Sequence, residues 1–344
     1  MATGRAFTGP GRVNLIGDHT DYNQGVALPM AIDLGVSVRW TPSVDGPIVV
    51  SSTGFDDAVD LPFDLTPDAG RLVDVEPDWA RLVGAMVVLC RPESGGTLDI
   101  DADLPIGAGL SSSAALTVAL AEAFGVEGPP EVIARLCQQA EHLAGAPVGI
   151  MDPLVCAGAR GGHAMMIDFA TVTWRQVPVP EDVEVVVVDS GQRRSVGSSP
   201  YRLRVAECEA ATALIGPLGL VGAPDLAGIR DPLLRRRARH VVAECARVRS
   251  FSEALATDDL ATAGTAMIES HRSLADDFEV STTEVDDLVD HLCSLPGVFG
   301  ARMTGAGFGG CVVTLARPGT VDPESMPWPT WRVRAVDGTV AARR

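Results

Sequence analysis

Lysine is absent from this 344-residue chain, in which all 27 basic side chains are arginines. This absence excludes a phosphate-binding loop built around a lysine, the strand lysine of protein kinases and every Schiff-base mechanism. Any phosphate site in this chain must therefore use backbone N–H groups, hydroxyls, arginine and a metal ion.

Positive charge is scarce as well. The 45 acidic residues outnumber the 27 basic ones and leave a net charge of −18, and the longest basic run is Arg235–Arg237. An acidic surface of this kind repels phosphate backbones and anionic lipids. We therefore expect neither a nucleic-acid partner nor a membrane partner.

Long apolar runs and paired cysteines are missing too. No segment is long enough to span a bilayer, no signal-peptide pattern opens the chain, and the seven cysteines are scattered singly without metal-ligand spacing. These features predict a cytoplasmic protein with reduced thiols. The length of the chain and its hydrophobic content of 46% allow two packed lobes or one large domain.

Glycines and serines gather in one short stretch, Leu104–Ala115, which runs into an apolar helical pattern over 114–124. Glycines let the backbone approach an anion, serines are typical helix caps, and a helix N-terminus attracts negative charge. With the strand-like segment 97–101 before it, the stretch predicts a phosphate-binding loop, and an ordinary serine-capped helix is the alternative. The predicted nucleotide-binding residues are Gly107, Ala108, Gly109, Leu110, Ser111, Ser112 and Ser113.

Polar side chains crowd the segment Gly9–Pro29 near the N-terminus. Asp18, His19 and Asp21 place three hydrogen-bonding side chains within four positions. Such a group suits a ligand with many hydroxyls, since hydroxyls both donate and accept hydrogen bonds. A solvated loop with turn-forming residues is the alternative.

Apolar periodicity predicts further helices over 78–90, over 131–143, from Ser198–Ser199 to Ile215, and three more between 231 and 295. Strands are expected at 163–169, at 183–188, at 311–315 after a glycine-rich turn, and at the edge of a sheet near 327–334. Aspartate before proline predicts a helix N-cap at Asp152. Without further information, a core position is expected for Trp79, a solvated one for Glu141, and structural roles for His163, His240, His271 and His291.

Three motifs of the chain resemble those of a known family. Residues 11–22, Gly-Arg-Val-Asn-Leu-Ile-Gly-Asp-His-Thr-Asp-Tyr, are similar to the galactokinase signature. Leu104–Ala115 resembles the second motif of the superfamily of galactose, homoserine, mevalonate and phosphomevalonate (GHMP) kinases, and the glycine-rich segment 302–315 resembles the third.

The resemblance implies an α+β, two-lobed small-molecule (GHMP-type) kinase fold with the active site in the cleft between the lobes. Residues 1–168 would form the lobe with the sugar signature and the phosphate-binding loop, and residues 169–344 the lobe with the third motif. The implied reaction transfers phosphate from ATP to the anomeric hydroxyl of galactose, with Mg²⁺ as cofactor. A monomer is expected.

The same resemblance implies roles for individual residues. Asp152, in a segment similar to the family's Gly-Ile-Met-Asp, corresponds to the catalytic base, and Arg12 beside it would keep the carboxylate ionised and neutralise phosphoryl charge. Ser113 and Glu141 correspond to the Mg²⁺ ligands. Trp79 is similar in setting to a tryptophan near the nucleotide. The implied sugar-binding residues are Asp18, His19, Thr20, Asp21 and Tyr201.

The chain departs from the family pattern at three points. Asp18 stands where galactokinases have glutamate, Pro153 replaces a glutamine, and the segment from Glu141 to Asp152 is one residue shorter. The first two favour, as one alternative, a 1-kinase for a related sugar such as L-arabinose, N-acetylgalactosamine or a secondary-metabolite sugar. A non-catalytic galactose and ATP sensor is a further alternative, disfavoured by the intact serine run, and the polyol-binding groups disfavour a mevalonate or homoserine kinase.

Overall fold

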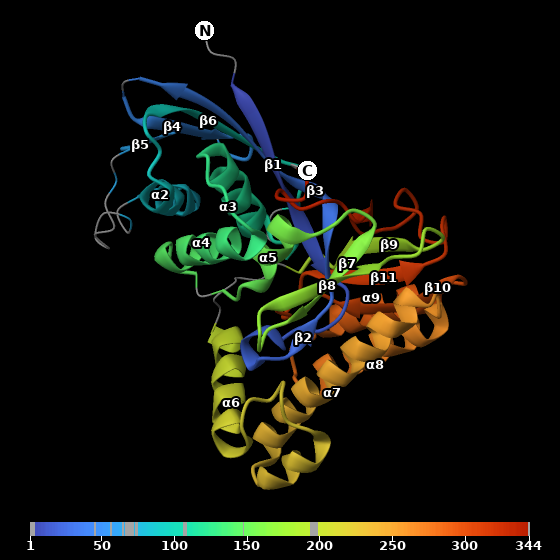
Figure 1. The fold of residues 1–344 in the computed structure, drawn as a ribbon. Helices are drawn as coiled ribbons and strands as arrows, with labels where there is room; N and C mark the ends of the chain where they lie inside the picture. The colour runs from blue at the N-terminus through green and yellow to red at the C-terminus, as the bar shows by residue number, and fades with distance from the viewer. Residues whose placement is uncertain are drawn as a thin grey trace.

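We describe the protein from a computed structural model, which covers residues 4–44, 46–55, 57–63, 65, 72, 75–105, 109–146, 148–192 and 199–342. Three β-sheets and their covering helices form a mixed α and β architecture (Figure 1). The predicted residues Gly107 and Ala108 lie outside the described part.

The first sheet has five strands in the order β1-β3-β6-β4-β5, antiparallel except for the pair β4 and β6. Its strands are β1 (Arg5–Asn14), β3 (Pro29–Ser43), β6 (Gly95–Ala102), β4 (Ile48–Ser52) and β5 (Val59–Leu61). Helix α3 (Ser112–Ala123) packs on β1 and β3, and three further helices pack around it (Figure 1). They are α2 (Asp78–Cys90), α4 (Pro130–Leu143) and α5 (Met151–Gly158).

The second sheet has the order β10-β11-β9-β12 and is antiparallel throughout. Its strands are β10 (Val298–Met303), β11 (Cys311–Ala316), β9 (Glu184–Asp189) and β12 (Thr330–Val333). Helices α8 (Leu260–Asp276) and α9 (Thr283–Ser294) pack against β10, and α7 (Pro232–Ala256) packs against α8. Strand β12 is the edge strand expected in the tail.

The third sheet, β2-β7-β8, lies between the other two. It consists of β2 (Val26–Ala27), β7 (His163–Asp168) and β8 (Thr173–Pro178). The five-stranded sheet lies wholly before the expected lobe division at 168/169 and the four-stranded sheet wholly after it, while the hairpin of β7 and β8 crosses it. The division itself stays a prediction.

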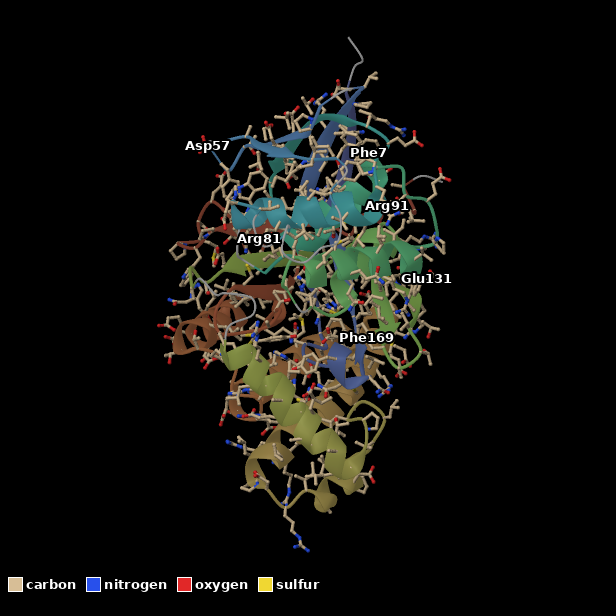
Figure 2. The ribbon with its side chains drawn as sticks, turned by 90° about the vertical axis from the view of Figure 1, so that its left-hand side faces the viewer. Phe7, Asp57, Arg81, Arg91, Glu131 and Phe169 are labelled. Carbon is tan, nitrogen blue, oxygen red and sulfur yellow. The ribbon has the colours of Figure 1, made fainter. Side chains whose placement is uncertain are left out.

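Helix α6 (Ser199–Ile215) stands at one end of the molecule, and the remaining elements are two short 3₁₀ helices, η1 (Asp21–Asn23) and η2 (Ala223–Gly228) (Figure 1). The helices expected at 78–90, over 114–124, at 131–143 and from Ser198–Ser199 to Ile215 begin and end within two residues of α2, α3, α4 and α6, and the three expected between 231 and 295 are α7, α8 and α9. Apolar side chains from both larger sheets fill the core, whereas charged ones such as Arg91 and Asp57 are exposed (Figure 2). Within the described residues we find no helix that combines the length and the hydropathy needed to cross a membrane.

Candidate active site

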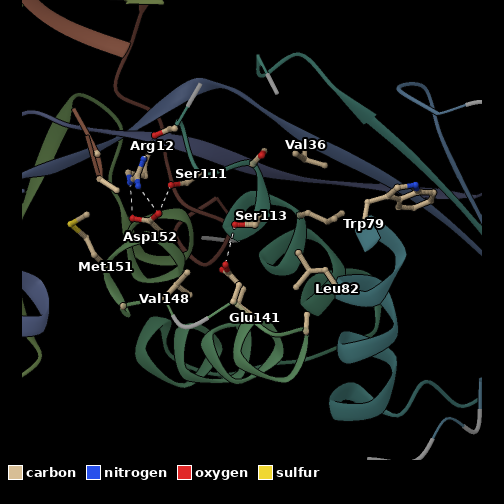
Figure 3. A pocket seen from close by; sticks show the side chains of 18 of the residues that line it. Arg12, Val36, Trp79, Leu82, Ser111, Ser113, Glu141, Val148, Met151 and Asp152 are labelled. Carbon is tan, nitrogen blue, oxygen red and sulfur yellow. Dashed lines mark hydrogen bonds and ion pairs between the residues drawn. The ribbon is translucent and has the colours of Figure 1, made fainter. Parts of the chain in front are cut away.

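A cavity of about 540 Å³ opens beside the N-terminus of α3 (Figure 3). Segments that are distant in the sequence line it, among them the end of β1 and the polar loop after it, the start of α3, the end of α4, the start of α5, the start of α6 and the turn after β10. The predicted residues on its wall are Arg12, Asp18, His19, Asp21, Gly109, Ser111, Ser112, Ser113, Glu141, Asp152 and Tyr201. The fold therefore brings most of the predicted site together.

Arg12 and Asp152 form an ion pair on this wall. Arg12 Nε donates to Asp152 Oδ1 over 2.7 Å, Nη2 donates to Oδ2 over 2.5 Å, and Nη1 donates to the Gly109 carbonyl over 2.7 Å. Burial works to lower the pKa of Arg12, but the ion pair outweighs burial and raises it. The Asp152 side chain is 29% exposed, against 6% for Arg12, so the carboxylate remains open to a ligand in the cavity.

Two sequence expectations about caps are wrong. Asp152 is not a helix N-cap: α5 begins at Met151 with Ile150 as its N-cap, so Asp152 lies inside the first turn. Ser111 does occupy the N-cap position of α3, but its hydroxyl makes no capping bond. It donates instead to Oδ2 of Asp152, and Ser111 adopts a left-handed φ of 62°. The Ser111 hydroxyl, which local sequence assigns to the helix, is therefore bonded to the Asp152 carboxylate.

Ser113 and Glu141 meet across the interface of α3 and α4. Ser113 Oγ donates to Glu141 Oε2 over 3.0 Å, and the other carboxylate oxygen, Oε1, is buried without a partner among the described residues. Burial, followed by the nearby charge of Asp152, raises the pKa of Glu141 to about 7. Glu141 is therefore buried, contrary to the solvated position expected from its helix alone.

The polar loop contributes aromatic and acidic groups. His19 adopts a left-handed φ of 66°, its Nδ1 lies 2.9 Å from the Tyr22 hydroxyl, and its ring lies 6.0 Å from that of Tyr201 between centroids. Burial, reinforced by the charges of Asp152 and Asp18, raises the pKa of Asp21 to about 6. These groups line the same cavity as the serines at the start of α3.

Thr20 and Leu110 act within the protein framework. The Thr20 hydroxyl is buried and lies 2.8 Å from both the Gly17 and the Val26 carbonyl oxygens, so it braces the loop, and Thr20 is not among the residues that line the cavity. The Leu110 carbonyl accepts the Arg12 N–H over 3.1 Å, which fixes the start of α3 to β1.

Asp18 is held from two sides. Its Oδ2 forms an ion pair with Arg302, and its Oδ1 accepts the Gly305 N–H over 2.7 Å. Arg302 carries no predicted role from the sequence, although it is the first residue of the segment 302–315 that resembles the third motif. The available signal was an arginine inside the apolar strand β10, where a charge needs a partner.

Trp79 lines the far part of the cavity and stacks on Phe55, with ring centroids 5.0 Å apart. Its indole N–H is buried without a partner among the described residues. Trp79 therefore packs against its neighbours, as expected from the sequence, and it also lines the cavity. His240 and His271 are buried and His163 is half-buried, and neither these three nor His291 lines the cavity.

Comparisons with known proteins agree with this geometry. The chain matches the galactokinase galactose-binding signature over residues 2–42, the N-terminal domain of GHMP kinases over 81–160 and their C-terminal domain over 251–323. It is 41% identical to the galactokinase of Homo sapiens over 90% of this chain and 83% of that protein. It is 42% identical to the galactokinase of Chloroflexus aurantiacus over 92% of this chain and 85% of that protein.

Solved structures give the same result. The structure of Lactococcus lactis galactokinase complexed with galactose superposes with a TM-score of 0.88 at 28% identity, covering 97% of this chain and 94% of that one. Methanococcus jannaschii mevalonate kinase shares the fold, with a TM-score of 0.69 at 18% identity over 98% of this chain and 99% of that one. With the Arg12–Asp152 pair and the serine-rich helix start on one cavity wall, these similarities establish that the chain belongs to the galactokinase family.

Proposed function

We propose that Asp152 is the general base and Arg12 the charge-stabilising cation of an ATP-dependent phosphorylation of galactose at its anomeric hydroxyl. Members of this family are ATP-dependent sugar kinases, and the chain is one of them. The observation that carries the assignment is the doubly hydrogen-bonded Arg12–Asp152 pair, which lies in one cavity with both the start of α3 and the polar loop.

The chemistry follows from these positions. Asp152 accepts the proton of the sugar hydroxyl as that oxygen forms its bond to the γ-phosphorus of ATP, while the bond from phosphorus to the β,γ-bridging oxygen breaks and ADP leaves. Arg12 holds the Asp152 carboxylate through two hydrogen bonds and offsets the charge that builds up on the transferring phosphoryl group. Among the described residues that line the cavity, Arg12 is the one arginine, and the chain has no lysine.

The phosphates of ATP are proposed to bind at residues 107–113. The N-terminus of α3 and the Ser111, Ser112 and Ser113 segment supply backbone N–H groups, hydroxyls and the positive end of the helix dipole. Trp79, with its unpartnered indole N–H, is proposed to contact the nucleotide at the far end of the cavity.

Mg²⁺ is proposed to bind between Ser113 and Glu141. The fit rests on the unpartnered Oε1 of Glu141 and on the preference of magnesium for one or two protein oxygens plus substrate phosphates. When bound, it would neutralise phosphate charge. The residues that the structure describes contain no cluster of three or more metal-binding side chains, so the proposed site would need oxygens of ATP to complete it.

The sugar is proposed to bind against Asp18, His19, Asp21 and Tyr201, with Thr20 bracing the loop behind them. Support comes from their shared cavity, since all four sugar-wall residues and Asp152 line it. The proposed partners are therefore sugar and ATP, and the expected monomer and the cytoplasmic location stay predictions.

A phosphotransfer assay over a panel of sugars tests the proposal, with the Asp152→Asn variant beside the parent. Turnover is expected with galactose, and the variant is expected to lose several orders of magnitude in kcat while galactose affinity is retained. A variant rate within about tenfold of the parent would remove Asp152 from the mechanism. Preferred turnover of another sugar would assign the chain to a related 1-kinase, and binding without any turnover would assign it to a sensor.

A further inference from the structure

A group of charged side chains is buried around Asp18, and its other members have no part in the proposed chemistry. Arg302 on β10 and Glu244 on α7 are fully buried, and Asp18 is 3% exposed. Arg247 completes the group through a hydrogen bond of 2.8 Å from its Nε to Glu244 Oε2. Two carboxylates therefore face two guanidinium groups, and we refer to these four residues as the buried charge cluster.

Arg302 is the centre of this cluster and uses all three of its nitrogens. Its Nη2 pairs with Asp18, its Nε donates to Ser270 Oγ over 3.1 Å, and its Nη1 lies 3.3 Å from the carbonyl oxygens of Asn14 and Leu15. One side chain of the second sheet thus fixes both the end of β1 and the first carboxylate of the polar loop. Since a guanidinium is rigid and planar, these contacts define one position for Asp18.

The same carboxylate also controls the third motif. Asp18 Oδ1 accepts the N–H of Gly305, whose φ is 84°, and the Thr304 hydroxyl bonds the Asn14 carbonyl over 3.0 Å. Gly305 and the next residue, Ala306, line the cavity together with the serines of α3. A single carboxylate of the proposed sugar wall is therefore hydrogen-bonded to a second loop of the same cavity, which the serines proposed to bind phosphate also line.

Burial makes this connection stiff. Charged hydrogen bonds in a low-dielectric interior are strong, and their partners cannot be replaced by water. A sugar that binds the Asp18 carboxylate therefore also affects Arg302 and the Gly305 N–H, which hold that carboxylate in place. Conversely, a ligand that orders residues 305–306 also orders the N–H group that donates to Asp18.

We propose that Arg302 is a positioning residue that couples sugar binding to nucleotide binding through the link Arg302–Asp18–Gly305. The inference rests on the proposed function and extends it to the energetics of the two ligands. Coupling between two binding sites is reciprocal, so each ligand tightens the other by the same factor.

Calorimetric titration measures this coupling factor, which is the dissociation constant of one ligand without the other divided by its dissociation constant with the other present. The dissociation constant of galactose is determined with and without saturating Mg²⁺ and the non-hydrolysable analogue AMPPNP, and the reverse titration follows. The parent is expected to bind each ligand about fivefold or more tightly when the other is present. In Arg302→Lys the factor is expected to fall to about one, because a single ammonium cannot reach Asp18, Ser270 and both carbonyls together.

A matched control separates coupling from general loss of a buried arginine. Arg237 on α7 is 1% exposed and pairs with Glu207 and Glu279, outside the buried charge cluster. Arg237→Lys is expected to lower the melting temperature as Arg302→Lys does and to keep the parental factor, even if sugar affinity changes. A parental factor in a folded Arg302→Lys variant would overturn the proposal.

A second variant covers the case in which Arg302→Lys does not fold. Thr304→Val removes the hydroxyl link to Asn14 with almost no change in volume, and its factor is expected to lie between those of the parent and one. Independent binding of the two ligands in the parent would overturn the inference while leaving the proposed function intact. Absence of galactose turnover in the parent would overturn the proposed function instead.

Discussion

At the scale of single residues, the site depends on which atoms of a side chain are hydrogen-bonded within the protein and which are left for a ligand. Arg12 directs two nitrogens at Asp152 and the third at the Gly109 carbonyl, so it links the proposed base to the phosphate-binding loop with one rigid group. One carboxylate oxygen of Glu141 accepts a hydrogen bond from Ser113, and the other has no partner among the described residues. The proposed reaction needs both the charge and the geometry of Arg12 and of Glu141, and a substitution at each residue tests this.

Arg12→Lys keeps the positive charge but loses the planar guanidinium, whose three nitrogens donate to Asp152 and Gly109. A lysine can reach one oxygen of Asp152 and cannot also hold the Gly109 carbonyl, so we expect kcat to fall about 100-fold or more. Steady-state kinetics at saturating galactose and ATP measure the loss. Arg239→Lys, at an arginine that is 52% exposed and pairs with Asp277 on the surface, is the control and is expected to keep parental kcat. Equal kcat in the parent and Arg12→Lys would show that charge alone suffices.

Glu141→Gln tests the proposed metal ligand. Removing the carboxylate charge should raise the Mg²⁺ concentration needed for half-maximal rate by about tenfold or more. Because burial raises the pKa of Glu141 to about 7, the parent should itself need more Mg²⁺ at pH 6 than at pH 8, and the variant should lose this pH dependence.

Magnesium titrations of the initial rate at fixed ATP check both statements about Glu141. Glu131→Gln, in the first turn of the same helix and at the surface in Figure 2, is expected to behave like the parent. An unchanged Mg²⁺ requirement in Glu141→Gln would mean that the metal is held elsewhere.

At the scale of elements, the start of α3 carries local strain that its function explains. Ser111 adopts a left-handed conformation that is unfavourable for a residue with a Cβ, and its hydroxyl serves Asp152 rather than the helix. Such strain persists only where the surroundings hold it, and it is frequent at functional sites. Stability and activity should therefore respond differently to substitution here.

Ser111→Gly and Ser111→Ala separate the two effects. Both remove the hydroxyl from Asp152, so both are expected to lower kcat to a similar extent. Glycine accepts a positive φ freely, so Ser111→Gly should be more stable than Ser111→Ala by about 1 kcal/mol. Thermal unfolding and steady-state kinetics on the same preparations check this. Parental activity in the glycine variant alone would show that backbone strain, and not the hydroxyl, matters for turnover.

At the scale of the whole molecule, buried ionisable groups make stability depend on pH. Burial lowers the pKa of His240 to about 4, and the charges of Arg247, His240 and Arg302 outweigh burial and lower the pKa of Glu244 to about 2. Between pH 6.5 and 4 the unfolded chain binds a proton at residue 240 that the native protein does not. The free energy of unfolding therefore falls as pH decreases through this range.

The contribution of His240 should amount to about 3 kcal/mol, lost between pH 6.5 and 4. Denaturant unfolding at several pH values measures it, and His240→Gln is expected to flatten this part of the curve. Asp21 works in the opposite direction, because its raised pKa of about 6 makes the native protein bind an extra proton between about pH 6 and 4. Asp21→Asn should accordingly steepen the acid loss, and an unchanged slope in His240→Gln would rule out this explanation.

The sequence alone predicted most of the helices and the glycine- and serine-rich stretch at the start of α3. Helices such as α2 and α6 follow from apolar periodicity and local stop signals, which depend only on neighbouring residues. The absence of lysine directed attention to Arg12, and the resemblance to a family supplied the roles of Asp152 and Glu141. These conclusions are local or inherited from family motifs, which is why they could be drawn without a structure.

Only the tertiary structure decided which polar groups are partners. The hydrogen-bonded residues Asp18 and Arg302 are 284 positions apart in the sequence, and Gly17 and Glu244 are 227 positions apart. The residues around one partner do not identify the other. Ser111 is a correct helix cap by local rules, yet the fold places a carboxylate from α5 within reach of its hydroxyl. Hydrogen bonds and ion pairs act over a few ångströms in space, so their partners are fixed by how the sheets and helices pack and not by order along the chain.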